Sequence, residues 1–142
     1  MSYPFREALL DTSVVVKWFV PEEDSEKALS LRHAQEERDL QLYAPEVLLM
    51  ELANALRYSS EFSAREIIEA LETPFELNIL LVPFSLDALN LALTLSLEHD
   101  LAVYDAYFLA LARAMEIPLI TADRRMLSRL TAEDGALSLG SL

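Results

Sequence analysis

The sequence predicts an α/β domain of three layers, in which helices flank a parallel sheet of four to five strands. Short apolar runs alternate with longer segments of helical pattern along the chain, and this order is typical of parallel strand–helix units. The 142 residues fit one domain, and no linker, repeat or low-complexity segment divides them. We therefore expect a single domain over residues 1–142.

Five short apolar segments are expected to form the strands. Each is bounded by polar residues or proline, and the last, "GALSL", is expected to lie at an edge of the sheet. In order along the chain, the segments are residues 7–11, 40–44, 78–83, 118–122 and 135–139.

The intervening segments carry signals for helices. Asp24 or Ser25 is expected to cap a surface helix over residues 24–38, and Pro45 is expected at the first position of the next helix. The segment "SARE" at residues 63–66 fits a capping box. Residues 103–115 are apolar on nearly all sides, so that helix should be buried. Further helices are expected at residues 13–20, 85–99 and 124–130.

The composition excludes several classes of site. The sequence has no cysteine, so disulfides, thiolate metal sites and thiol nucleophiles are ruled out. Its two glycines, Gly135 and Gly140, lie too late for the glycine-rich loop that a nucleotide site needs after an early strand. No apolar stretch reaches the roughly 18 residues of a membrane span, and the first residues lack a signal-peptide pattern, so we expect no membrane contact and a cytoplasmic location.

The charge and apolar content bear on possible partners. The net charge of -13, from 24 acidic and 11 basic residues, argues against a broad grip on nucleic acid, which needs clustered Lys and Arg. A local basic strip remains compatible with it. The 53% hydrophobic content supplies a full core and leaves apolar surface for a protein partner.

Four carboxylates interrupt apolar segments, where an unpaired charge is costly to bury. Asp11 ends "EALLD" and Asp123 follows "PLITA", so both are expected beyond the carboxyl end of a strand, where α/β sheets form sites. Glu51 interrupts "VLLMELANAL", and Asp105 falls in the first turn of the apolar helix. If all four face one cleft, their repulsion favours a bound cation, and oxygen ligands suit Mg²⁺ or Mn²⁺.

Each of these acids also has a structural interpretation, and the residues leave both open. Asp11 and Asp123 could cap the helices that follow them, and Asp105 could pair with a helix dipole. Glu51 could lie on the solvent face of an amphipathic helix. Four carboxylates that all interrupt apolar segments nevertheless favour one shared site over four unrelated structural roles.

The segments around the four acids resemble, in order, the four acidic motifs of the PIN domain. They read "LLDTSVVVKWF", "LLMELANALR", "VYDAYFLALA" and "LITADRRML", and the resemblance extends from about Leu9 to Leu130. The last two segments have the residue patterns most specific to these motifs. The set looks most like the VapC branch of toxin–antitoxin ribonucleases.

This resemblance implies a metal-dependent endoribonuclease that uses Mg²⁺ or Mn²⁺ and a metal-activated water to hydrolyse RNA. It also implies a PIN-like parallel sheet, a homodimer, and a small antitoxin protein as a partner. The implied catalytic and metal-binding residues are Asp11, Glu51, Asp105 and Asp123. The residues implied to support the metal or its waters are Thr12, Ser13 and Thr121.

Two arginines directly after the last acid have two open interpretations. Arg124 and Arg125 could contact RNA phosphates, or they could pair with the abundant acids of this chain. The alternative function is a catalytically weak PIN module that acts mainly through protein–protein binding, which the acidic surface and the apolar excess allow. Phosphatase-like use of Asp11 is disfavoured because Ser13, and not a second aspartate, stands two residues on.

Overall fold

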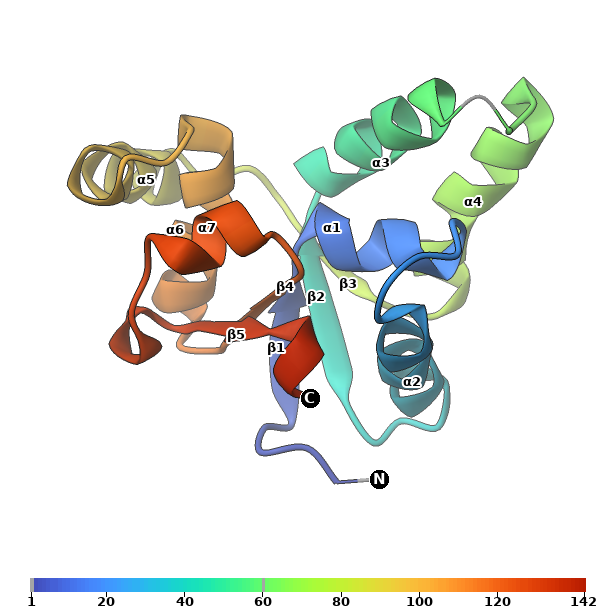
Figure 1. Cartoon of the computed structure of the whole chain (residues 1–142), viewed down its shortest axis with the longest axis horizontal. Helices are drawn as coiled ribbons and strands as arrows, with labels where there is room; N and C mark the ends of the chain where they lie inside the picture. The colour runs from blue at the N-terminus through green and yellow to red at the C-terminus, as the bar shows by residue number, and fades with distance from the viewer. Residues whose placement is uncertain (1, 60) are drawn as a thin grey trace.

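The computed structural model describes residues 2–59 and 61–142 and has a five-stranded parallel sheet (Figure 1). The order across the sheet is β3-β2-β1-β4-β5, and each neighbouring pair is parallel. The strands are β1 (Glu7–Leu10), β2 (Gln41–Pro45), β3 (Leu80–Val82), β4 (Leu119–Thr121) and β5 (Ala136–Ser138). The predicted α/β class is confirmed, and so is the position of the last strand at an edge.

The helices connect these strands in the predicted alternation. The first, α1, continues into a 3₁₀ turn over Val16–Trp18. The α-helices are α1 (Thr12–Val15), α2 (Ser25–Glu36), α3 (Val47–Tyr58), α4 (Ala64–Glu76), α5 (Leu86–His99), α6 (Val103–Met115) and α7 (Arg124–Ser128). None of those within the described residues is long and apolar enough to cross a membrane.

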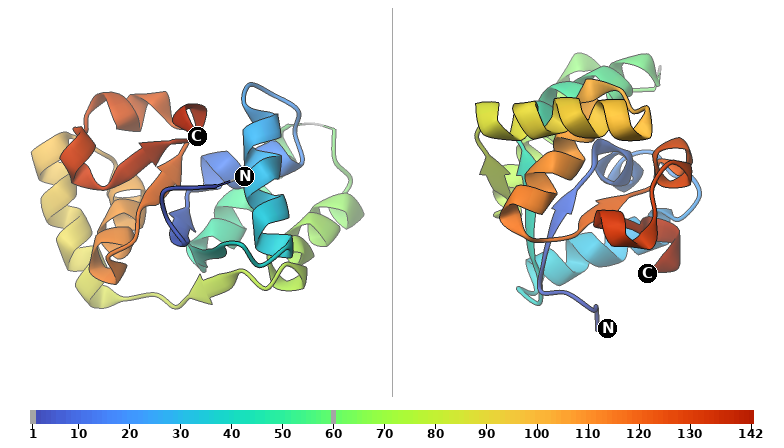
Figure 2. Two further views of the ribbon diagram at one scale, coloured as in Figure 1. Left: turned by 90° about the horizontal axis from the view of Figure 1, so that it is seen from below. Right: turned by 90° about the vertical axis from the view of Figure 1, so that its left-hand side faces the viewer.

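The chain changes direction across the sheet at β1. It runs from β1 to β2 and β3, then crosses to the other side of β1 and forms β4 and β5. Because parallel crossovers are right-handed, α1 to α4 cover one face and α5 and α6 cover the other, an arrangement that can be followed in Figures 1 and 2. The carboxyl ends of β1 and β4 adjoin at this switch point, where sheets of this kind bind ligands.

The core is built around α6, as its apolar sequence predicts. Seven consecutive residues, Ala106 to Ala112, are buried. This helix contacts α5 along its length and also lies against β1 and β4. Its first turn stands beside the switch point, immediately before this buried stretch.

Two predicted helix starts need correction. Asp24 occupies the cap position of α2, but its backbone is left-handed (φ 63°) and its side chain makes no capping bond. The hydroxyl of Ser25 instead accepts from the backbone N–H of Glu22 at 2.9 Å. Pro45 does not open α3 but ends β2 opposite Val82, because the β2–β3 ladder continues one residue further than the sequence suggests.

The predicted capping box at the start of α4 is confirmed. The backbone N–H of Glu66 donates to Ser63 Oγ at 3.1 Å, and the backbone N–H of Ser63 donates to Glu66 Oε1 at 2.9 Å. Both groups would otherwise lack partners at this helix end.

Candidate functional site

Asp11 lies at the centre of the candidate site, directly after β1. Its backbone N–H donates to the carbonyl of Ile120 at 3.0 Å, which fixes it beside the end of β4. The residue is only 8% exposed. Its Oδ2 accepts two hydrogen bonds of 2.7 Å, from the hydroxyls of Ser13 and Thr121. Asp11 occupies the cap position of α1, but its side chain makes no capping bond to that helix.

The same two hydroxyls join the loops that follow β1 and β4. Ser13 Oγ accepts from the backbone N–H of Ala122 at 2.9 Å, and Thr121 Oγ1 accepts from the backbone N–H of Asp123 at 3.0 Å. The two hydroxyl oxygens lie 3.3 Å apart. Small hydroxyl residues are needed here because each must donate to Asp11 and accept from a backbone N–H at once.

Glu51 and Asp105 approach from helices on opposite faces of the sheet. Glu51, in the second turn of α3, is half-buried, and its Oε1 accepts from Thr12 Oγ1 at 2.5 Å. The interpretation of Glu51 as a solvent-facing residue is therefore wrong. Asp105 is also half-buried and stands in the first turn of α6.

Asp123 both caps a helix and belongs to the acidic cluster, two roles that the sequence left as alternatives. It caps α7, since its Oδ1 accepts from the backbone N–H of Met126 at 3.1 Å. It also lies close enough to Asp11 and Asp105 to raise the pKa of both carboxyl groups through its charge. Capping and membership of the acidic cluster are thus compatible at this position.

Burial and mutual repulsion raise the pKa values of three of the carboxyl groups. For Asp11 the largest cause is burial, opposed by the hydrogen bonds from Thr121 and Ser13. Burial also raises the pKa of Glu51, and the charges of Asp11 and Asp105 add to it. The pKa of Asp105 rises to about 6 through burial and the charges of Asp11 and Asp123. The acids therefore form one electrostatic unit.

The side chains do not converge into a ready metal cage. Within residues 2–59 and 61–142, no three Asp, Glu or His side chains are arranged so that they could hold a metal ion together. Oε1 of Glu51 and Oδ1 of Asp123 are engaged by Thr12 and by the start of α7. The donors are all oxygen, which suits Mg²⁺ or Mn²⁺, but coordination requires some of these side chains to turn. The four-ligand set stays a prediction.

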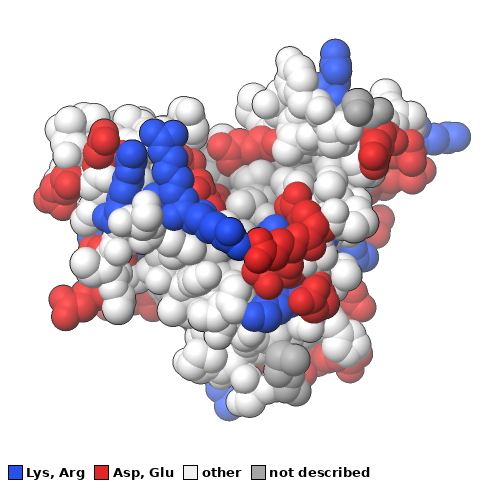
Figure 3. Space-filling model, in the orientation of Figure 1, with Lys and Arg blue, Asp and Glu red and all other residues white. Residues whose placement is uncertain are grey.

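The structure separates the two arginines that follow Asp123. Arg124 pairs with Glu23 on the exposed surface. Arg125 forms no ion pair with any residue that the structure describes, and its charge acts to lower the pKa of Asp105. Figure 3 shows basic side chains gathered where α7 lies in Figure 1, next to an acidic group.

Comparison with known proteins decides the family. The sequence model of the PIN domain family matches residues 8–132, which are most of the chain. The chain belongs to the PIN domain family. It is 34% identical to Ribonuclease VapC3 of Pyrobaculum aerophilum over 126 residues, which are 87% of this chain and 95% of that protein.

Solved structures share the PIN domain fold at low sequence identity. A toxin–antitoxin complex from Klebsiella pneumoniae matches with a TM-score of 0.65 and 22% identity, over 93% of this chain and 97% of that one. VapC20 of Mycobacterium tuberculosis, a toxin that cleaves the sarcin–ricin loop, matches with a TM-score of 0.69 and 16% identity, over 89% and 97%. The predicted resemblance is confirmed.

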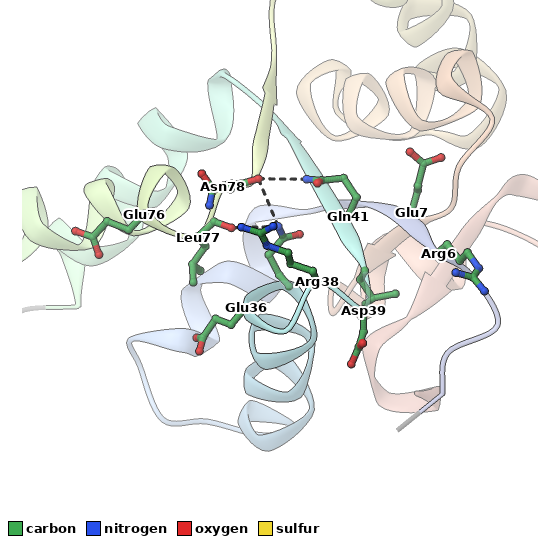
Figure 4. A pocket seen from close by; sticks show the side chains of 11 residues that line it. Arg6, Glu7, Glu36, Arg38, Asp39, Gln41, Glu76, Leu77 and Asn78 are labelled. Atoms are coloured by element: carbon green, nitrogen blue, oxygen red, sulfur yellow. Dashed lines mark hydrogen bonds between the residues drawn. The ribbon is translucent and has the colours of Figure 1, made fainter.

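One hollow of this PIN domain lies away from the candidate site. It measures about 870 Å³ and lies at the amino ends of β1 and β2, where Glu7 and Gln41 line it (Figure 4). Its buried amide, that of Gln35, already donates to the carbonyl of Leu77 at 3.1 Å and accepts from the N–H of Leu42 at 2.6 Å. This polar group holds α2 to the sheet and is not available for chemistry.

Proposed function

We propose that this PIN domain is a metal-dependent endoribonuclease and the toxin of a toxin–antitoxin pair. The observation that carries the proposal is the coupled set of carboxylates at the carboxyl ends of β1 and β4, where Asp11 and Asp105 have raised pKa values. The similarity to Ribonuclease VapC3 supports RNA as the substrate.

We infer that Asp11, Glu51, Asp105 and Asp123 hold Mg²⁺ or Mn²⁺. The bound ion would supply an activated water and shield the charge of the phosphoryl oxygens. The chain's own hydroxyls favour the ionised form of two ligands and orient them: Thr12 donates to Glu51, while Ser13 and Thr121 donate to Asp11. Each of these bonds opposes the pKa rise caused by burial.

Growth and RNA integrity on overproduction test this function. The parent chain is expected to arrest growth and fragment cellular RNA, and Asp105→Asn is expected to do neither. Co-production of a cognate antitoxin should restore growth to the parent. Equal RNA fragmentation by parent and variant would overturn the catalytic assignment, whereas intact RNA with both would favour a PIN module that acts only by binding protein.

A change in the basic side chains is expected to flatten the salt dependence of RNA binding. Salt dependence is the slope of the logarithm of the binding constant against the logarithm of the salt concentration. Each phosphate contact that is lost should reduce the magnitude of this slope by about 0.7 for single-stranded RNA. Arg125→Ala should lower it by about that amount, and Arg124→Ala by less, because Arg124 is already paired with Glu23. Binding titrations at several salt concentrations measure the slopes, with Arg65→Ala on α4 as the control. Equal slopes for parent and Arg125→Ala would contradict the contact.

We also expect a homodimer with an aliphatic interface. Leu93 and Leu97, one turn apart on α5, are 53% and 78% exposed. An apolar stripe of this kind is costly to leave in water and is typical of an interface. Sedimentation equilibrium should show a dimer for the parent and a monomer for the double variant Leu93→Lys, Leu97→Lys. A parent that stays monomeric at all concentrations would contradict this prediction.

A further inference from the structure

A second feature adjoins the acidic cluster and is not explained by it. A hollow of about 330 Å³ opens between the start of α6 and α7. Asp105 and Asp123 form part of its wall, so it continues directly from the candidate site. Its other polar or aromatic lining includes Tyr104, Arg125 and Arg129. A hollow of this size is at the lower end of the range for ligand sites and suits one small unit.

Tyr104 offers an exposed aromatic face in the wall of the hollow. Its side chain is 64% exposed, although the helix that carries it is buried from Ala106 onward. In the described part of the chain, no other aromatic ring stacks on it and no arginine lies over it. Because Tyr104 lies on a helix, the ring can bind a flat partner without ordering a loop.

The two arginines of the hollow have different roles. Arg129 is anchored by Asp100, with Nη1 3.4 Å from Oδ2 and a further bond to the carbonyl of the same residue. Arg129 therefore forms part of the wall. Arg125 has no such partner among the described residues and is exposed beside Asp105. Its guanidinium can therefore pair with a phosphate of a nucleotide chain that passes the acidic cluster.

We propose that this hollow is a subsite for one nucleotide of single-stranded RNA beside the scissile phosphate, with the base stacked on Tyr104 and an adjacent phosphate bound by Arg125. The proposal rests on the ribonuclease function proposed above. A base must be unstacked from its neighbours to reach such a ring, which selects single strands or loops over duplex RNA.

Cleavage of short single-stranded oligoribonucleotides tests the subsite. Tyr104→Ala is expected to raise KM about tenfold with little change in kcat, since stacking of one base on an aromatic ring contributes about that factor. Tyr104→Phe keeps the ring and should recover most of the loss. Phe75→Ala removes an equally exposed ring from α4 and should leave KM at the parent value. With 2-aminopurine placed beside the cleaved bond, parent binding should quench its fluorescence and Tyr104→Ala should not.

The outcomes separate the two proposals. If the parent cleaves no RNA and binds no oligonucleotide, the ribonuclease function itself fails. If the parent cleaves, but Tyr104→Ala has parental KM and quenching, the subsite is overturned and the function stands. If Tyr104→Phe loses as much as Tyr104→Ala at equal thermal stability, the ring does not stack on a base, and the proposal is likewise overturned.

Discussion

Replacing Asp105 with Asn is expected to abolish cleavage and yet leave the metal-free protein at least as stable as the parent at neutral pH. Asn keeps the shape and removes one charge from a cluster in which Asp11 and Asp123 raise the pKa of Asp105. Loss of an outer partner of a metal ligand already costs about 10–100-fold, so loss of a ligand should cost more than about 100-fold in activity.

The pH dependence of the stability difference follows from the direction of the pKa shift. The folded-state pKa of Asp105 is about 6, above its ordinary value of 3.8, so the folded protein binds this proton more tightly than the unfolded chain. The resulting destabilisation is fully present above pH 6 and disappears as the pH falls toward 4. In EDTA, the melting temperature of Asp105→Asn should therefore exceed that of the parent at pH 7, by roughly 2–4 °C, and match it near pH 4.

A matched variant separates this effect from the helix dipole. Asp87 stands in the first turn of α5, as Asp105 does in α6, but it is exposed. Asp87→Asn should give no gain at pH 7, because it relieves no crowding. If Asp105→Asn melts below the parent at pH 7 in EDTA, Asp105 serves as a structural dipole partner and the repulsive cluster does not exist as described.

Chelation is expected to stop cleavage completely, and Mg²⁺ to restore it and stabilise the parent. A ligand at 100 times its Kd stabilises the folded state by about 2.7 kcal/mol, which corresponds to about 10 °C in melting temperature for a chain of this length. The shift should be much smaller for Asp105→Asn and for Asp11→Asn. Differential scanning calorimetry with and without Mg²⁺ measures it, and gel assays with excess EDTA measure cleavage.

Mn²⁺ is expected to substitute for Mg²⁺, because the donors are all oxygen. Ca²⁺, which prefers longer bonds and more ligands, makes a useful control for charge alone. Cleavage at the parent rate in excess chelator, with no melting shift from any of the three ions, would contradict a metal mechanism.

The elements of the fold could be predicted because each one has a local signal. The alternation of apolar runs and helices gives the parallel sheet, and the uniform apolarity of residues 103–115 gives its buried helix. The start of α2 was mispredicted for a local reason too: Asp24 has the right residue type for a cap but a left-handed backbone. Backbone conformation of this kind depends on the whole loop and not on one residue.

The candidate site could be predicted only in part. Asp11 and Glu51 stand out because they interrupt apolar runs, but the link from Thr12 to Glu51 joins residues 39 apart and has no signature in either segment. The pairing of Arg124 with Glu23 spans 101 residues and is equally invisible. The exposure of Tyr104 could not be predicted with the same ease, because an aromatic residue in an apolar helix looks like core; its position in the first turn is the available clue.

The burial of α6 also determines where hydrogen exchange would report on a ligand bound at the acidic cluster. Amide protons in such a helix exchange with solvent only when the whole domain unfolds, whereas those of exposed loops exchange through local fluctuations. Asp105 stands one residue before this buried stretch and is close enough to Asp11 and Asp123 for their charges to raise its pKa. Any ligand that relieves their repulsion must therefore slow hydrogen exchange along α6 as a unit, from Tyr107 to Ala112, far beyond the residues it touches.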